Sequence, residues 1–216
     1  MRILPRLDAR LACIAQQVPV CELAADIGAD HGKLSCWLLL SGRVRRMIVS
    51  DISKTSREKA RDLFVSYGLM EQVCLTGADG LHALRGRPQT IIIAGMGGNL
   101  LQSILLQDVC LDGARLVLGA HTELPLVRDA LVERRYQILH ETLVLADGRY
   151  YRVITAEPGY MTLTAKQRIM GIHVRASAGV SLEAYYRWQM QVAASWRGDR
   201  GMAYRAYLKE ELNKNG

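Results

Sequence analysis

The most constraining feature of this 216-residue chain is the run Thr90-Ile91-Ile92-Ile93-Ala94, which is apolar and almost entirely β-branched. A strand with apolar side chains on both faces is covered on both faces, as in the centre of a parallel sheet. Parallel strands need long crossover connections, which are usually helices. The run therefore predicts an α/β protein with helices on both faces of a mostly parallel sheet.

The rest of the chain repeats this pattern. An amphipathic helix is expected over residues 4–18, and strands are expected over residues 20–27, 47–51, 73–76, 90–94 and 115–119. Two further strands, over 136–145 and 149–156, are joined by Asp147-Gly148, a strong hairpin signal. An all-parallel dehydrogenase sheet does not end in this way. We therefore expect the Rossmann-like, seven-stranded class I methyltransferase sheet, whose last strand is antiparallel.

The segment Glu157-Pro158-Gly159 interrupts the alternation and marks a boundary. We predict a first domain over residues 1–157 and a small helical C-terminal domain over 160–216. Its expected helices cover 164–176, 181–196 and 202–212. The second carries Tyr185, Trp188, Val192 and Trp196 at steps of three or four residues, a stripe more often used for packing than for stacking on bases.

The formal net charge is +7 and the sequence pI is about 9.3, which favours a polyanionic partner. Residues 160–216 hold nine Lys or Arg against four Asp or Glu, so most of the excess lies in the tail. We predict contacts to the phosphates of such a partner at Arg43, Arg45, Arg46, Arg197, Arg200 and Arg205.

The five cysteines form no C-x-x-C pair, and no cysteine or histidine cluster has zinc-like spacing. Free thiols, no metal and a cytoplasmic location are therefore expected. No signal peptide or membrane-spanning run is seen, so no membrane partner is expected. We expect a monomer.

The segment Ala24-Ala25-Asp26-Ile27-Gly28-Ala29-Asp30-His31-Gly32 takes an apolar strand into a glycine turn. Such a turn lets a ligand approach the backbone, and Asp26 could accept hydrogen bonds from an amino group or a ribose. The spacing differs from the G-x-G-x-x-G fingerprint, so a nucleotide-like ligand other than NAD is favoured. Taken alone, the turn fits an ordinary strand–helix connection equally well.

Other strand ends carry acids or glycines. Asp51 lies 23 residues beyond Gly28, where a Rossmann-like fold holds ribose hydroxyls, although it could instead cap the next helix. Asp79, before Gly80, could reach an adenine amino group. The segment 95–98, Gly-Met-Gly-Gly, follows the buried strand, and three glycines exceed what close helix–strand packing needs.

Three segments together, residues 26–31, 78–81 and 93–98, resemble the bacterial tRNA (adenine-22 N1)-methyltransferases. The resemblance covers residues 4–156 and implies a class I domain for S-adenosyl-L-methionine (SAM), followed by a helical domain. Two segments depart from the family pattern. Gly32-Lys33-Leu34-Ser35 replaces A-Y-L-P, and Gly119-Ala120-His121-Thr122 replaces Q-P-N.

The resemblance implies roles for particular residues. It implies a cofactor site made of Asp26, Gly28, Asp30, Asp51, Ile52, Asp79, Gly80, Ala94 and Gly95. Its candidate catalytic residues are Asp30, His31, Gly95 and Met96. The implied reaction is methyl transfer to N1 of adenine 22 in tRNA.

The residues themselves bear on the chemistry. Adenine N1 carries its own lone pair, so no base is needed before attack; Asp30 could stabilise the cationic product, and His31 could relay a proton or orient the loop. Enzymes that methylate exocyclic amino groups typically carry D/N-P-P-Y/F after strand four, which Ala94-Gly95-Met96-Gly97 does not match. Two alternatives remain: a methyltransferase of a small molecule or protein, and a non-catalytic RNA- or nucleotide-binding module.

Overall fold

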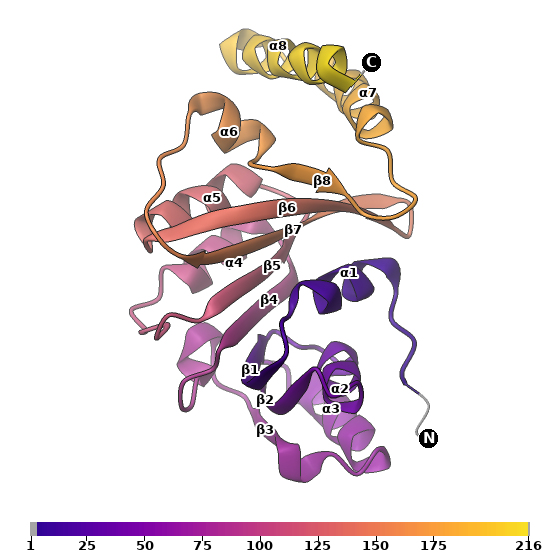
Figure 1. The fold of residues 1–216 in the computed structure, drawn as a ribbon, viewed down its shortest axis with the longest axis vertical. Helices are drawn as coiled ribbons and strands as arrows, with labels where there is room; N and C mark the ends of the chain where they lie inside the picture. The colour runs from indigo at the N-terminus through magenta and orange to yellow at the C-terminus, as the bar shows by residue number, and fades with distance from the viewer. Residues whose placement is uncertain (1–3, 216) are drawn as a thin grey trace.

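The computed structural model describes residues 4–215, apart from the side chains of Arg200 and Asn215. Within these residues the strands form one eight-stranded sheet of order β3-β2-β1-β4-β5-β7-β6-β8 (Figure 1). The strands are β1 Cys21–Ile27, β2 Val44–Ser50, β3 Val73–Thr76, β4 Thr90–Met96, β5 Arg115–Ala120, β6 Tyr136–Ala146, β7 Arg149–Pro158 and β8 Val174–Ala176.

Most helices alternate with these strands. They are α1 Ala9–Gln17, α2 Lys33–Leu40, α3 Lys54–Ser66, α4 Gly98–Leu105, α5 Leu124–Glu133, α6 Ala165–Met170, α7 Leu182–Ala193 and α8 Gly198–Asn215. Two short 3-10 helices, η1 Met70–Gln72 and η2 Gly80–Ala83, flank β3.

The sheet topology confirms the expected fold class. Strands β3, β2, β1, β4 and β5 pair in parallel, and β7 pairs antiparallel with both β5 and β6. All seven predicted strands are present. An eighth, β8, was not predicted and pairs in parallel with β6.

Helices cover both faces of the sheet, and the buried run of β4 shows why it is apolar throughout. Ile91 and Ile93 pack in a core with α4 and α5, whereas Ile92 packs on the opposite face with α1, α2 and α3. All three side chains are fully buried. Strand β4 therefore joins the two cores. Burial of each of these three side chains contributes roughly 1.5–3 kcal/mol to folding.

Two predicted helix boundaries were wrong. The first helix begins at Ala9 rather than residue 4, because the Asp8 carboxylate accepts a hydrogen bond from Leu11 N (2.7 Å) and caps it. The helix predicted over 164–176 ends at Met170. Gly171 has a φ of +102°, which ends the helix and leads the chain into β8.

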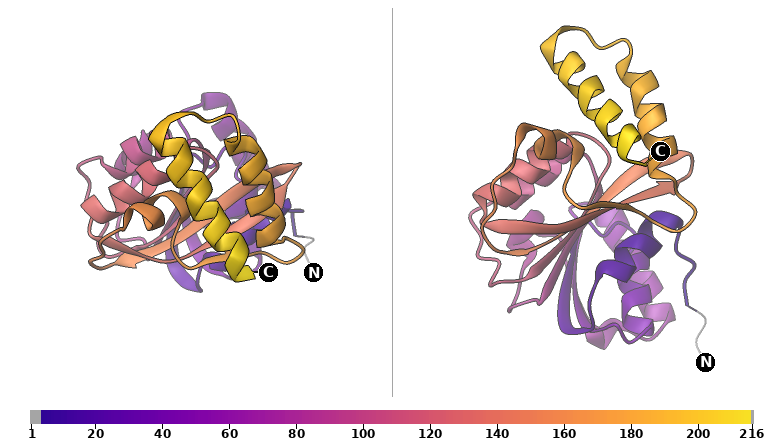
Figure 2. Two further views of the ribbon diagram at one scale, coloured as in Figure 1. Left: turned by 90° about the horizontal axis from the view of Figure 1, so that it is seen from above. Right: turned by 45° about the horizontal axis from the view of Figure 1, so that its top comes forward.

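The chain finishes in a helical hairpin, α7 and α8, that projects from the sheet (Figure 2). Both helices were predicted, although α8 is longer than residues 202–212. Tyr186, Ala193 and Leu208 form the hairpin core together with Met170, while Trp196 remains 43% exposed. The division into domains 1–157 and 160–216 stays a prediction, and β8 ties residues 174–176 to the main sheet.

Candidate active site

A cleft of about 320 Å³ opens at the carboxyl ends of β1 and β4. It is lined by Asp8, Arg10, Leu11, Asp26, Gly28, Ala29, Asp30, His31, Lys33, Leu34, Ala94 and Gly95. The two glycine turns predicted as a binding site therefore face the same cleft.

The first turn is held by backbone conformations that require glycine. Gly28 and Gly32 have φ values of +72° and +69°. A Cβ on Gly32 would lie 2.8 Å from Phe64 Cζ in α3, so the turn sits directly on that helix. Gly28 N and Ala29 N both donate to Ser50 O at the end of β2 (2.8 and 2.9 Å), which fixes the turn against the neighbouring strand.

Asp26 is the buried acid of the cleft. Its side chain is 3% exposed, and Asp26 Oδ2 accepts a hydrogen bond from Ser35 Oγ at 2.6 Å. Burial raises the pKa of Asp26 to about 6, against the lowering effect of Ser35 and with a smaller raising effect from the Asp51 charge. The carboxylate is therefore mostly ionised at neutral pH, and a cationic ligand group is its natural partner.

Asp51 connects the first turn to the start of α3. Its Oδ2 accepts from Asp30 N (2.9 Å) and its Oδ1 accepts from Ser53 N (2.8 Å). Ser53, not Asp51, caps α3 through Ser56 N. Each carboxylate oxygen has two acceptor sites, so Asp51 retains the capacity to accept from both hydroxyls of a cis-diol.

The region after β3 contains the remaining predicted cofactor residues. Asp79 is exposed at the start of η2 and its side chain does not cap that helix. Gly80 packs on Gln107, whose Oε1 accepts from Leu81 N at 2.7 Å. Ile52, next to Asp51, is 71% exposed and offers an apolar surface at this rim.

The second glycine turn leaves β4 through a register shift between Ala94 and Met96. Gly95, at the shift, is exposed and has a φ of +79°. Met96 covers the first turn, since its Cε would lie 2.8 Å from a Cβ on Gly28. Gly98 N donates to Thr122 O (3.2 Å), so this turn is braced by the loop after β5.

His31 and Asp30 lie at the outer rim. His31 Nε2 is 3.3 Å from Asp30 Oδ1 and 3.3 Å from Lys59 Nζ. Ser56 Oγ also donates to Asp30 Oδ1 (3.1 Å). Asp30 adopts a φ of +50°, which directs its backbone N–H to Asp51.

Sequence reasoning missed the contribution of α1. Arg10 lines the cleft, and its Nη1 would lie 3.2 Å from a Cβ on Gly95. Its guanidinium stands 5.4 Å from the ring centre of Tyr151, and Tyr151 meets His121 edge to face at 5.7 Å. The signal was an arginine on the polar side of the helix just before the glycine turn.

The arginines predicted to contact RNA lie elsewhere. Arg43 donates to Val18 O (2.7 Å), and Arg45 and Arg46 approach Glu22 at the amino ends of the strands, the opposite edge from the cleft. In the hairpin, Arg205 donates to Ala193 O and Trp196 O, both at 2.8 Å, and so caps α7.

Of the other two tail arginines, Arg197 is exposed. The Arg200 side chain lies outside the described part of the structure. A role in RNA binding stays a prediction for all six arginines.

Two features are absent from residues 4–215, the part of the chain that the structure describes. No group of three His, Cys, Asp or Glu side chains gathers there in a way that could hold a metal ion. No helix in this range has the length and apolar character to cross a bilayer.

Sheet order, the antiparallel β7 and the cleft at the carboxyl strand ends define a class I methyltransferase fold. A family described as a methyltransferase domain matches residues 7–154. The Bacillus subtilis tRNA (adenine(22)-N(1))-methyltransferase is 31% identical over 157 residues, 71% of this chain and 66% of that enzyme. The chain thus spans slightly less than two thirds of that relative's length.

Solved structures agree with this class. The B. subtilis tRNA methyltransferase TrmK has a TM-score of 0.77 at 22% identity and covers 97% of each chain, which shows a shared fold. A candidate tRNA methyltransferase from Streptococcus pneumoniae, solved in complex with SAM, has a TM-score of 0.83 at 25% identity over 94% of this chain and 98% of that one. The present chain belongs to the bacterial tRNA (adenine-22 N1)-methyltransferase family.

Proposed function

We propose that this protein transfers the methyl group of SAM to N1 of adenine 22 in tRNA. The observation that carries the proposal is one cleft bounded by both glycine turns, with Asp26 buried in its wall. The similarity to the B. subtilis enzyme supports the choice of tRNA and of the base.

The residues present fit SAM. Ionised Asp26 would pair with the ammonium of the methionine part, and Asp51 would accept hydrogen bonds from the ribose hydroxyls. Asp79 would accept from the adenine amino group, with Ile52 against the ring. The positive φ of Gly28 leaves bare backbone where the cofactor passes closest. When bound, SAM supplies an electrophilic methyl group on a positively charged sulfur.

The acceptor base would enter beside Gly95, which has no side chain and which Arg10 approaches from α1 within the same cleft. N1 attacks with its own lone pair, so positioning supplies most of the rate and no side chain needs to remove a proton first. The segment 95–97 offers no side-chain acceptor for an exocyclic amino group, which favours a ring nitrogen. Asp30 at the rim would stabilise the positive charge that methylation leaves on the base.

The decisive experiment incubates the full chain with methyl-labelled SAM and unmodified tRNA, then maps the labelled nucleoside. We expect N1-methyladenosine at one position, and no label when tRNA is omitted. Label that forms without RNA would indicate a small-molecule or protein substrate. Binding of SAM or RNA without any transfer would indicate the non-catalytic module.

A further inference from the structure

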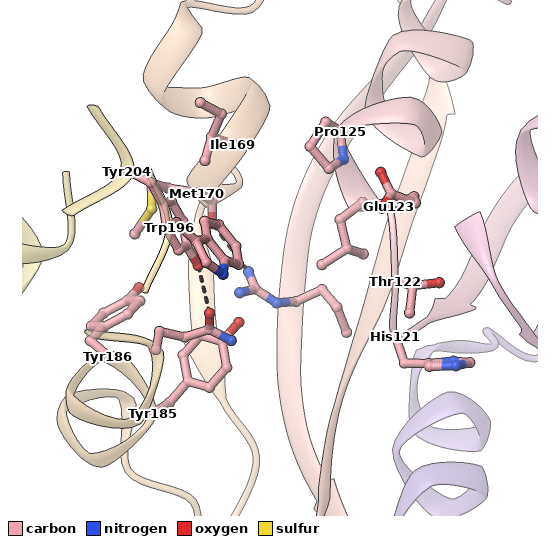
Figure 3. Close-up of a pocket in the computed structure, with 13 residues that line it drawn as sticks. His121, Thr122, Glu123, Pro125, Ile169, Met170, Tyr185, Tyr186, Trp196 and Tyr204 are labelled. Atoms are coloured by element: carbon pink, nitrogen blue, oxygen red, sulfur yellow. Dashed lines mark hydrogen bonds between the residues drawn. The ribbon is translucent and has the colours of Figure 1, made fainter. Parts of the chain in front are cut away.

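A second cavity, of about 220 Å³, lies where the α7–α8 hairpin meets the carboxyl end of β5 and the amino end of β7 (Figure 3). The loop His121 to Glu123 forms one wall. Tyr185, Tyr186, Trp196 and Tyr204 of the hairpin form the wall opposite (Figure 3). The cavity is therefore separate from the SAM cleft but shares the loop that braces Gly98.

A buried cation with an unused donor lines this cavity. Arg128 Nε and Nη2 donate to the two oxygens of Glu141, both at 2.8 Å, and Arg152 Nη1 donates to Glu141 Oε2 at 3.2 Å. These side chains are 0%, 0% and 3% exposed, so two guanidinium groups share one buried carboxylate. Arg152 lines the cavity, and its buried Nε has no hydrogen-bond partner within residues 4–215.

The opposite wall is aromatic. The rings of Trp196 and Tyr204 stack at 5.2 Å with an interplanar angle of 17°. Trp196 remains 43% exposed, so part of the stack is open to solvent. Tyr204 Oη donates to Gln189 Oε1 (2.8 Å), which leaves the Gln189 amide N–H groups as further donors.

These features together suit a flat ring that carries hydrogen-bond acceptors. Arg152 and the Gln189 amide nitrogen offer donors alone, and the aromatic wall offers a stacking surface. The acidic lining residue, Glu123, disfavours a phosphate inside the cavity. The volume is below the roughly 300–1,000 Å³ of pockets for drug-sized ligands, so it fits a single base.

We infer that this cavity holds one unpaired, carbonyl-bearing nucleobase of the RNA substrate, stacked on Trp196 with its acceptor atoms toward Arg152. The inference rests on the proposed function for the identity of the RNA. Because Thr122 belongs both to the cavity wall and to the contact with Gly98, the held base lies close along the strand to the base that enters the cleft. Anchoring it would help to keep the target base out of its stack.

The first test observes the cavity directly. The three tryptophans, Trp37, Trp188 and Trp196, are labelled with 5-fluorotryptophan and their 19F resonances are assigned from single Phe variants. S-adenosylhomocysteine is added in excess to fill the cofactor cleft, and GMP, UMP or AMP is then titrated. We expect GMP and UMP to shift the Trp196 resonance alone, at lower concentrations than AMP.

The second test measures tRNA binding and methylation in matched variants. Trp196→Ala should weaken tRNA binding and raise the KM for tRNA by roughly 10-fold, with SAM affinity and kcat unchanged, since stacking affects binding alone. Trp196→Phe keeps a stacking ring and should recover most of the affinity. Trp188→Ala removes an equally exposed tryptophan of the same hairpin that does not line this cavity, and should behave as the wild type.

The outcomes separate this inference from the proposed function. If the nucleotides leave the Trp196 resonance unmoved, if AMP binds tighter than GMP and UMP, or if Trp188→Ala loses as much tRNA affinity as Trp196→Ala, the cavity does not hold such a base. A wild-type protein that methylates no tRNA refutes the proposed function, while the 19F titration still decides the cavity.

Discussion

Asp26→Asn separates the stability of the fold from the binding of the cofactor. Burial raises the pKa of the Asp26 carboxyl from 3.8 to about 6, so ionising it in the folded chain is unfavourable relative to the unfolded chain. A difference of about two pKa units corresponds to about 2–3 kcal/mol above pH 6. Asparagine keeps an oxygen that can accept from Ser35 and carries no charge. We therefore expect Asp26→Asn to raise the free energy of unfolding by about 2–3 kcal/mol at pH 7.5.

The pH dependence provides an internal check. Because the folded pKa of Asp26 lies above the unfolded value of 3.8, the penalty is complete above about pH 6, decreases as the pH falls, and is absent below both values. The stability advantage of Asp26→Asn should accordingly shrink to about half by pH 5. Urea unfolding followed by far-ultraviolet circular dichroism at pH 7.5 and pH 5 measures both differences.

Cofactor binding should change in the opposite direction. Loss of a charged hydrogen-bond acceptor removes about 1.5–3 kcal/mol, so SAM should bind roughly 10- to 150-fold more weakly to Asp26→Asn in calorimetric titrations. Wild-type affinity should fall below pH 6 as Asp26 becomes protonated, whereas the variant should lack this dependence. Ser35→Ala is the control: it keeps the charge, removes the 2.6 Å hydrogen bond and should lower stability. The reasoning is refuted if Asp26→Asn is no more stable than the wild type at pH 7.5. It is also refuted if the difference in free energy of unfolding between the two proteins is the same at pH 7.5 and pH 5.

Four other substitutions test the structure around the cleft and the buried network beside the second cavity. Gly98→Ala places a Cβ 2.4 Å from Thr122 O and should cost about 3 kcal/mol in urea unfolding, while Gly97→Ala meets only the Thr122 side chain at 3.0 Å and should cost under about 1 kcal/mol. Asp30→Gly fits the positive φ and keeps the N–H to Asp51, so SAM affinity should hold while kcat with tRNA falls about 10-fold. Glu141→Gln leaves two buried guanidinium groups without a counter-charge and should lower the free energy of unfolding by about 3–5 kcal/mol. Equal losses for the two glycine variants, weaker SAM binding by Asp30→Gly, or wild-type stability of Glu141→Gln would each contradict these expectations.

The sheet could be predicted because its strands are specified by local patterns. An uninterrupted apolar run such as residues 90–94 fits few environments, and Asp147-Gly148 identifies the hairpin without reference to the rest of the chain. The three-residue strand β8 has no such signal, since its identity depends on pairing with β6. The start of α1 was misplaced because Leu4 and Leu7 continue the apolar spacing, while Asp8 ends it through a hydrogen bond that periodicity does not reveal.

The second cavity could not be predicted, because it depends on charged residues in apolar elements. Arg128, Glu141 and Arg152 are 13 and 11 residues apart along the chain and lie on three different elements. Each alone suggests a solvated position, and only packing of α5, β6 and β7 turns them into one buried network. Their backbone contacts with α6, such as Arg128 Nη1 to Arg168 O (2.7 Å), also fix the segment that leads to the hairpin.

The position of the cleft, in contrast, follows from connectivity. Strand order runs from β1 to β2 and β3 on one side and through β4 to β5 on the other, so the order reverses between β1 and β4. The helices after these two strands consequently pack on opposite faces, α2 in one core and α4 in the other. The cleft opens at the carboxyl edge between them, which is where open α/β sheets bind ligands. Gly28 and Gly95 follow those same two strands, so their turns must border the crevice, and α1 adds Arg10 from the side that connectivity leaves uncovered.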